Sequence, residues 1–559
     1  MTLLIRISAV ALMLVVAFIA LVFLVIPAFR HQDLTPVYAT EFASKVTTAS
    51  APSINEGIGG VVTVAGKGTT AMLRVYNRPR KERFVDVVTT EFTELDGRFE
   101  LALSPGDYQL LVSKGPEFEF VFHDFSVNAG ESINMDIDLV QLVDMTQRGW
   151  FAGDPHQHSA FADGKDAIDD LLRANAAVGL HWSVQTDHNV VGQNPVARQA
   201  AIDMGLEHAG HAPYHTVGGD EVTTRIGHMI VWEPLNPLGE YEHIDHETPG
   251  HDDPLEERLD AIHRIAHEMR EMGQFQNINH PHGGSRAYEA FGDNASSTWG
   301  DMNLDWVRHK ETVLQFDATE GWNGGSGFMQ GGIYYFGSRA EHPFEAMERV
   351  FHQWYRLLNT GAKFPSLGSS DTHDTKVAEQ IAGYNRLSEG VKEVFFGLHP
   401  YLPQGLAYAL TDDVPGALMY QHLDFVENQL EDIALMGGSP RTYVYTGGEL
   451  TTEKLAQNMA HSFVTSGPLL LAQINGAMPG ETALPQAQNT LELDIVSHKP
   501  LSRLMVVVDG ELAVDKRYDH VMHIKDSLAL DIRGKKWAIV YVEGENNYAY
   551  AYTNPIYFH

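Results

Sequence analysis

Short apolar segments alternate with amphipathic helices from Gly149 onward, and this alternation constrains the fold more than any other feature of the chain. Such alternation is typical of βα units, whose parallel strands form one sheet. Helical spacing of Ile168, Leu171 and Leu172 predicts a helix over residues 168–176, and a similar apolar stripe predicts another over 254–272. Seven strands are predicted, at residues 150–153, 182–185, 216–219, 275–279, 313–318, 364–368 and 441–445. The central part of the chain is therefore expected to be an α/β unit.

Histidine and carboxylate residues stand at the end of five of the first six predicted strands. In chain order they are Asp154, His156 and His158, with Asp163 shortly after; Asp187 and His188; Asp220 and Glu221, with His228 seven residues on; His280 and His282; and Asp371 and His373. The fifth strand ends less clearly, in residues 320–323. In a (β/α) barrel the C-terminal strand ends converge on one mouth, where active sites are built. We therefore expect these side chains to meet in space.

Imidazole and carboxylate groups in this pattern predict a metal centre. The chain has 28 histidines and no cysteine, which excludes thiolate ligands and thiol nucleophiles. The donor set suits Zn²⁺, Mn²⁺ or Fe²⁺, and a shared carboxylate such as Glu221 is suited to bridge two ions that hold a hydroxide between them. The alternative is a set of incidental surface histidines, because one His-x-His motif is a weak signal. The recurrence at five strand ends favours the metal centre.

Two other catalytic patterns are disfavoured. His263 and His267 lie four residues apart on a predicted helix, but Arg264 stands where the zinc-protease motif requires Glu. Both histidines are expected on a solvated helix face. A Ser-His-Asp hydrolase is the main rival, yet the chain contains no Gly-x-Ser-x-Gly elbow, and no P-loop or dinucleotide fingerprint either.

The regions that flank the α/β unit consist of short strands and turns. From about Gly57 to Leu142, β-rich runs are separated by turns such as Asp96-Gly97, a pattern typical of a β-sandwich. Short strands return after Pro468. The expected organisation is a signal anchor or signal peptide (1–30), a linker (31–54), a β-sandwich (55–145), the α/β unit (149–467) and a C-terminal β domain (468–559).

The N-terminus and the net charge bear on location and partners. Residues 7–29 are 23 uncharged residues that follow Arg6, long enough to cross a bilayer as a helix. An exported protein held by an uncleaved anchor is expected, and the alternative is cleavage near Ala39 and a secreted or periplasmic protein. With 39 basic and 73 acidic residues the net charge is −34, which disfavours a nucleic-acid polymer. It does not exclude a small phosphorylated substrate held by a local cation, and a small-molecule substrate is the expected partner.

The ordered motifs resemble those of the PHP family (polymerase and histidinol phosphatase domains), which are metal-dependent hydrolases on a distorted seven-stranded βα barrel. The resemblance covers residues 149–467. The Gly149–Asp154 segment, Ser466-Gly467-Pro468 and the closing Thr553-Asn554-Pro555 resemble the CehA/McbA branch, named for carbaryl hydrolase. Residues 96–108 resemble a carboxypeptidase regulatory-like domain. The resemblance implies a multidomain α/β protein, with a distorted (β/α)7 PHP barrel flanked by two β-sandwich-like modules.

The same resemblance implies two or three divalent ions and a role for each motif residue. The implied ligands are His156, His158, Glu221 and Asp371 for one ion; Glu221, His228 and His280 for a second; and Asp163, His188 and His373 for a third. Glu221, Asp371 and Asp187 would be the catalytic carboxylates, with Asp187 orienting the ligand histidines. Arg286 and His282 would contact the substrate, with Arg286 receiving an anionic group.

The implied activity is hydrolysis, in which a metal-bridging hydroxide attacks a phosphoester or a carboxylester or carbamate. The alternative is a non-catalytic exported binding protein of the cell envelope, which the two flanking β modules would suit.

Overall fold

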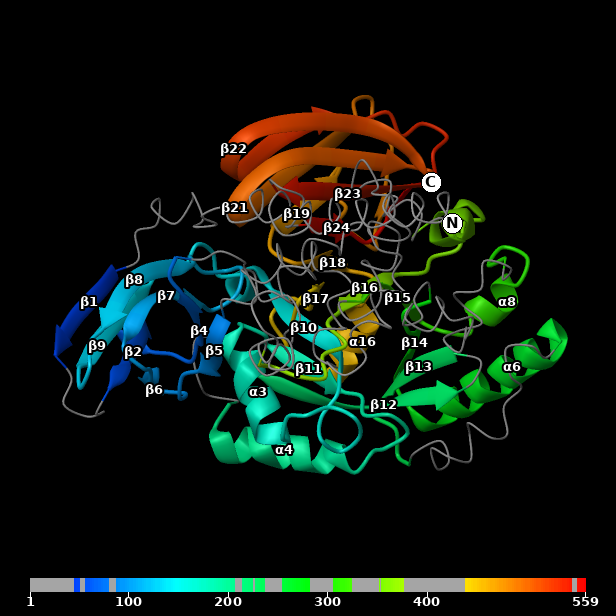
Figure 1. The fold of residues 1–559 in the computed structure, drawn as a ribbon. Helices are drawn as coiled ribbons and strands as arrows, with labels where there is room; N and C mark the ends of the chain where they lie inside the picture. Colours follow the sequence, from blue (N-terminus) through cyan, green and yellow to red (C-terminus); the bar gives the residue numbers. More distant parts are fainter. Residues whose placement is uncertain are drawn as a thin grey trace, which may run out of the picture.

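Figure 1 shows the computed structural model of the chain. It describes residues 45–50, 56–79, 87–206, 214–224, 227–236, 254–281, 305–323, 351, 353–376, 438–544 and 550–558. The predicted N-terminal anchor lies outside these residues. Within them, no helix is both long and apolar enough to cross a membrane.

Two sheets form the N-terminal part of the described chain. One contains β1 (Lys45–Ser50), β9 (Ser132–Leu139), β2 (Gly57–Val64), β3 (Lys67–Gly68) and β6 (Arg98–Ala102), and the other contains β5 (Val87–Phe92), β4 (Met72–Asn77), β7 (Gly106–Ser113) and β8 (Val121–Val127). Alternation in β6 buries Phe99 and Leu101, which join Ile58 and Leu73 in a core between the sheets. Strand β1 lies within the segment predicted as a linker and pairs with β9.

The sheet that carries the candidate site begins with three parallel strands, β10 (Trp150–Gln157), β11 (Trp182–Gln185) and β12 (His215–Thr224). Helices α3 (Ile168–Ala177) and α4 (Gln193–Met204) connect them. Ile168, Leu171 and Leu172 of helix α3 are buried, and Gly179 follows the helix with a positive φ of 76°.

The second half of this strand series includes an antiparallel strand. β13 (Gly227–Trp232) runs antiparallel to both β12 and β14 (Phe275–Ile278), whereas β14, β15 (Ala318–Asn323) and β16 (Ser366–Ser369) are parallel. Helix α6 (Leu255–Met272) precedes β14, and the single turn α8 (Lys310–Val313) precedes β15.

The first and last strands of the series meet at their C-terminal ends. The backbone N–H of Asp371 donates to the carbonyl of His156 at 3.0 Å, and that of His158 donates to the carbonyl of Thr372 at 2.9 Å. The strands therefore curve round to one mouth, as the sequence predicts. A barrel of seven repeated βα units is not what the described residues form, because β13 is antiparallel and helices are few.

The same sheet continues into the C-terminal part of the chain. β17 (Arg441–Tyr445) pairs with β10, and the sheet proceeds through β18 (Ser462–Thr465), β24 (Tyr550–Thr553), β23 (Trp537–Gly544), β21 (Thr490–Val508) and β19 (Leu469–Ile474). Three further strands, β20 (Thr482–Ala483), β22 (Glu511–Ala529) and β25 (Ile556–Phe558), complete it, and α16 (Thr452–Asn458) lies between β17 and β18. Tyr552 packs against Phe351 and Trp354, so the apolar core also runs across the domain boundary predicted at residue 467.

The helices predicted over 168–176 and 254–272 agree with α3 and α6, but the strand predicted at 313–318 is wrong. Residues 310–313 form α8, and β15 begins at Ala318. Val313 and Phe316 are apolar because they lie in a buried cluster with α6, not because they form a strand. β15 contains Thr, Glu, Gly and Asn. It is buried throughout, yet its sequence does not have the apolar pattern expected of a buried strand.

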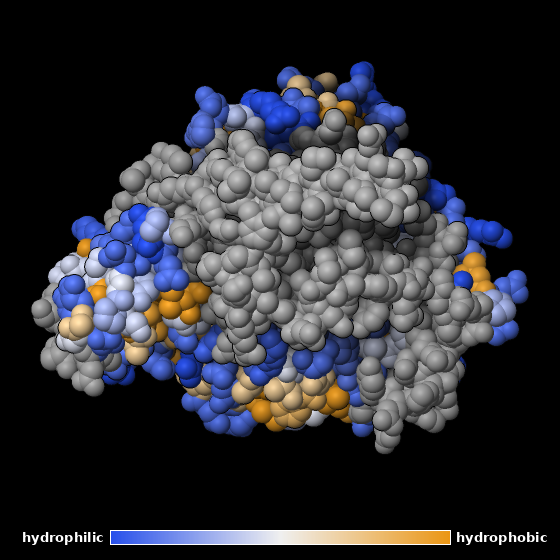
Figure 2. Space-filling model, in the orientation of Figure 1, coloured by the Kyte–Doolittle hydropathy of each residue, from blue (hydrophilic) through white to orange (hydrophobic). Residues whose placement is uncertain are grey.

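Hydrophilic residues cover most of the coloured surface in Figure 2. Hydrophobic residues gather at the lower edge of this view, where α4 lies in Figure 1. On this helix Val196 and Ile202 are 42% and 55% exposed.

Candidate metal centre

The ligand candidates are positioned by strand pairing. His156 is the last residue but one of β10, and His158 follows directly after the strand, so both side chains leave the same face. Glu221 lies within β12, and His228 pairs with Thr223 from the antiparallel β13, which places Glu221 and His228 on one face of this ladder. The sequence located His228 only by its spacing; the hairpin of β12 and β13 explains why it faces Glu221.

A first group of donors surrounds the Nε2 atoms of His156 and His158, which are 3.0 Å apart. Glu221 Oε2 lies 3.1 Å from His156 Nε2 and 3.2 Å from His158 Nε2. Asp371 Oδ1 lies 3.2 Å and 3.0 Å from the same two nitrogens. Ligand atoms at about 2.1 Å from one Zn²⁺-sized ion are themselves separated by about 3.0–3.4 Å. These spacings therefore fit a divalent ion.

A second group lies at the other oxygen of Glu221. Its Oε1 is 3.0 Å from His228 Nδ1 and 3.3 Å from His280 Nε2. His188 Nδ1 approaches Oε2 at 3.0 Å and lies close enough to His228 to share a cation with it and Glu221. The carboxylate thus presents Oε2 to His156 and His158 and Oε1 to His228 and His280, which is the geometry of a bridging ligand.

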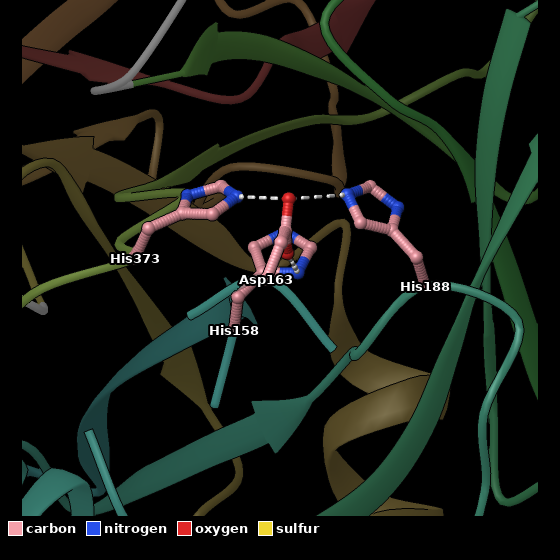
Figure 3. A group of neighbouring side chains, drawn as sticks. All are labelled: His158, Asp163, His188 and His373. Atoms are coloured by element: carbon pink, nitrogen blue, oxygen red, sulfur yellow. Dashed lines mark ion pairs between the residues drawn. The ribbon is translucent and has the colours of Figure 1, made fainter. Parts of the chain in front are cut away.

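A third group surrounds Asp163. Figure 3 shows its carboxylate between the rings of His188 and His373, with His158 beneath. Asp163 Oδ2 lies 3.3 Å from His373 Nε2 and 3.5 Å from His188 Nε2, and Oδ1 lies 3.6 Å from His158 Nδ1. Because a neutral imidazole has one lone pair for a metal, His158 and His188 can each ligate in only one of the groups that they border.

The charges of the first two groups compensate one another. Burial alone would raise the pKa of Glu221, but His156, His188 and His228 hold it well below its usual range. Burial lowers the pKa of His156, and Asp371, Glu221 and Glu320 outweigh that effect and raise it well above the ordinary value. The carboxylates therefore favour the protonated form of His156, and a divalent ion that binds to this ring must displace a proton.

An orphaned acceptor also supports a cation. Glu221 Oε2 is buried and accepts no hydrogen bond of normal geometry within the described residues, although three ring nitrogens lie within 3.2 Å of it. Buried polar atoms are nearly always satisfied. Imidazole nitrogens and carboxylate oxygens that converge around such an unsatisfied oxygen fit Zn²⁺, Mn²⁺ or Fe²⁺.

Backbone conformation at two candidate ligands is also unusual. Asp371 has a φ of 51° and His280 a φ of 21°, values that residues other than glycine seldom adopt. The surrounding structure maintains these conformations, as with the hydrogen bond from Asp371 N to His156 O. Such conformations cluster at functional sites.

Three supporting residues were not identified from the sequence. Asn279 Nδ2 donates to Glu221 Oε1 at 2.8 Å, and Asn323 Nδ2 donates to Asp371 Oδ2 at 3.1 Å. Glu320 Oε1 accepts from His156 Nδ1 at 2.9 Å. Asn279 directly follows β14, and Glu320 and Asn323 lie on β15, which is short and fully buried. The fifth strand was predicted too early in the chain, so no role for Glu320 and Asn323 was predicted from the sequence.

Asp187 forms hydrogen bonds with the loop that follows His158. Its two oxygens accept hydrogen bonds from the backbone N–H and the hydroxyl of Ser159, at 2.8 Å and 2.7 Å. It therefore holds the loop that follows His158. Burial raises the pKa of Asp187, and the hydrogen bonds from Ser159 and the nearby rings of His158 and His188 oppose that rise. His282 and Arg286, the predicted substrate contacts, lie outside the described residues.

The helix histidines His263 and His267 lie apart from all three groups. His267 has a side chain that is 72% exposed, in agreement with a solvated helix face. His263 is half-buried and Thr312 lies 2.8 Å from its Nε2, so only one of the two is fully solvated.

No protein-family model and no curated protein matches this chain. Among solved structures, it is similar to a two-domain protein from Bacteroides vulgatus ATCC 8482 that contains a predicted PHP-like metal-dependent phosphoesterase. That match has 14% identity, covers 71% of this chain and 91% of the other, and has a TM-score of 0.33. An amidohydrolase from Chromobacterium violaceum with bound sulfate and no metal matches at 14% identity over 40% of this chain and 87% of its own, with a TM-score of 0.24. These scores are too low to carry a conclusion about this chain.

Proposed function

We propose that this chain is a metal-dependent hydrolase of the PHP type, from its CehA/McbA branch. The observation that carries the proposal is the arrangement around Glu221, a buried carboxylate that presents one oxygen to His156 and His158 and the other to His228 and His280. Asp371 completes the first group. A structural ion pair needs one partner, and five histidines around one carboxylate are better explained by cations between them.

The candidate ligands would be shared among the ions as follows. His156, His158, Glu221 and Asp371 would hold one ion; Glu221, His228 and His280 a second; and Asp163, His188 and His373 a third. Divalent ions held there supply positive charge that lowers the pKa of water and stabilises negative charge on a phosphoryl or carbonyl oxygen.

Exposure indicates the side from which substrate enters. The side chains of His156 and Glu221 are 0% and 1% exposed, whereas those of His373 and Asp163 are 37% and 54% exposed. The Asp163 group therefore borders solvent, and the substrate would approach from this side. We infer that a small ester contacts this group first, while the ions near Glu221 lie deeper.

The substrate would be a phosphoester or a carboxylester or carbamate. His282 and Arg286 follow His280 in the chain and remain our proposed substrate contacts, with the guanidinium suited to an anionic group. The apolar run at residues 7–29 would anchor the exported protein in a membrane.

The test is metal analysis of the purified protein, followed by turnover of p-nitrophenyl phosphate, bis-p-nitrophenyl phosphate, p-nitrophenyl acetate and an aryl carbamate. We expect two or three ions per chain, turnover of at least one substrate, loss of turnover with a chelator and recovery on adding Zn²⁺ or Mn²⁺. A protein that retains its ions and turns over none of these compounds would favour a non-catalytic binding protein. A protein that binds no divalent ion would refute the metal centre itself.

A further inference from the structure

Glu320 lies within β15 and is 2% exposed. Four donors converge on its carboxylate. Oε1 lies 2.9 Å from His156 Nδ1 and accepts from the hydroxyl of Ser369. Oε2 accepts from the backbone N–H of His280 at 2.7 Å and from Asn323 Nδ2 at 3.0 Å. A carboxylate has about four lone-pair positions, so all of them are used.

This arrangement determines which nitrogen of His156 carries the proton in its neutral form. An ionised carboxylate can only accept, so the Nδ1 that faces Glu320 must donate. The lone pair then lies on Nε2, which is the atom 3.1 Å from Glu221 Oε2 and 3.2 Å from Asp371 Oδ1. His156 is fully buried, and no solvent competes for either nitrogen.

We propose that Glu320 is a positioning residue for the metal centre: it keeps the proton on Nδ1 of His156 and so makes Nε2 available to a cation. The proposal rests on the metal centre proposed above, but not on any reaction there. Glu320 reaches the cation only through His156, and through its contact with the backbone of His280 it also holds a residue of the second group in place. One strand thus supports ligands of two ions without supplying a ligand itself.

The alternative is that Glu320 only satisfies buried donors and stabilises the fold. Glu320→Gln separates the two roles. The backbone N–H of His280 cannot change into an acceptor, so the oxygen of the new amide should face it, and the amide NH₂ should face His156. Nδ1 of His156 must then accept, which moves the proton to Nε2 and blocks that atom as a ligand. A merely structural role predicts lower stability but unchanged coordination by His156.

The experiment uses the full-length chain in mild detergent, stripped of metal with a chelator and titrated with Co²⁺. Affinity is measured by competition with a chromophoric chelator, and the visible absorption of Co²⁺ reports the donor set. Four proteins are compared: the parent, Glu320→Gln, His156→Ala, and the double variant. Glu117→Gln is the matched control, because Glu117 is also buried and accepts two hydrogen bonds, from Met145 N and Tyr443 OH.

We expect Glu320→Gln to weaken one Co²⁺ site by about 10–100-fold, the usual effect of removing a partner of a ligand histidine, and to change its absorption spectrum. In the His156→Ala background, Glu320→Gln should have little further effect on the affinity of that site, because Glu320 acts on it through His156. Glu117→Gln should bind Co²⁺ like the parent.

Two results would overturn the proposal: parent affinity and spectrum in Glu320→Gln, or an equal loss of affinity with and without His156. If the parent binds Co²⁺ and Glu320→Gln weakens it, but no ester is turned over, the hydrolase proposal fails and the positioning role stands. If the parent hydrolyses esters and Glu320→Gln binds metal normally, only the positioning role fails.

Discussion

Replacing Glu221 by glutamine should be among the most damaging single substitutions in this protein. The side chain keeps its size, but it loses a negative charge that lies within 3.3 Å of five ring nitrogens. Those nitrogens belong to His156, His158, His188, His228 and His280. An amide also brings an NH₂ donor, which cannot ligate a cation, so one of the two groups loses its shared oxygen.

Hydrogen bonding determines which group that is. Asn279 Nδ2 donates to Glu221 Oε1 at 2.8 Å, and the Asn279 oxygen accepts from Asn277 Nδ2 at 2.9 Å, so this amide is oriented as a donor. In Glu221→Gln the oxygen of the new amide should therefore stay beside Asn279, and its NH₂ should face His156 and His158. Residues that only orient a ligand change metal affinity by about 10–100-fold, so loss of a direct anionic ligand should cost at least about 100-fold. That corresponds to about 2.8 kcal/mol, at about 1.4 kcal/mol per tenfold change.

Metal content by mass spectrometry and turnover of the best ester, measured beside the parent and Glu117→Gln, test this reasoning. We expect the ion of the His156 and His158 group to be lost first and turnover to fall with it, while Glu117→Gln behaves like the parent. The far-ultraviolet circular dichroism of Glu221→Gln should match that of the parent, because the side chain is not part of an apolar cluster. Full metal content with an unchanged rate would refute the bridging role of Glu221.

Three further outcomes are expected. Because carboxylates raise the pKa of His156 despite its burial, metal binding should release protons near neutral pH and should weaken as the pH falls. Calorimetry in two buffers of different ionisation enthalpy measures the number of protons released, and a value of zero would contradict this prediction. His267→Ala should leave metal content and activity unchanged. His263→Ala should lose its contacts with Thr312 and Gln315, at about 1 kcal/mol of stability each by thermal unfolding, and keep its metal; metal loss from either variant would show that the site is misassigned. Residues 45–559 expressed alone should remain in the supernatant after ultracentrifugation, whereas persistent membrane association would count against a single N-terminal anchor.

The candidate ligands could be identified from the sequence because each follows or belongs to a short strand, and strand ends converge. His156, His158 and Asp371 lie at or directly after strands that sequence patterns locate within a few residues. The third group, around Asp163, is the one that the family resemblance implied, and its side chains lie close together in the structure.

What surrounds the ligands was less predictable. The antiparallel course of β13 depends on pairing with both β12 and β14, which no local pattern encodes. Glu320 was missed because its strand is polar although it is buried. The apolar residues just before this strand, Val313 in α8 and Phe316 after it, lie in a buried cluster with α6. No pattern predicted that both hydrogen bonds to Asp187 would come from Ser159. Such partners are chosen by tertiary packing and not by spacing.

The ladder that joins β10 to the segment after β16 determines when the candidate centre can form. Its two hydrogen bonds connect the backbones of His156 and His158 with those of Asp371 and Thr372. His158 and Asp371 are separated by 213 positions, so a chain synthesised from its N-terminus contains the first pair of histidines long before the carboxylate that completes their group. Closing so long a loop is entropically costly, and contacts of this kind form late in folding. A cation held here would therefore not direct the early steps of folding; it would bind the assembled strands, and its main effect would be to slow their separation.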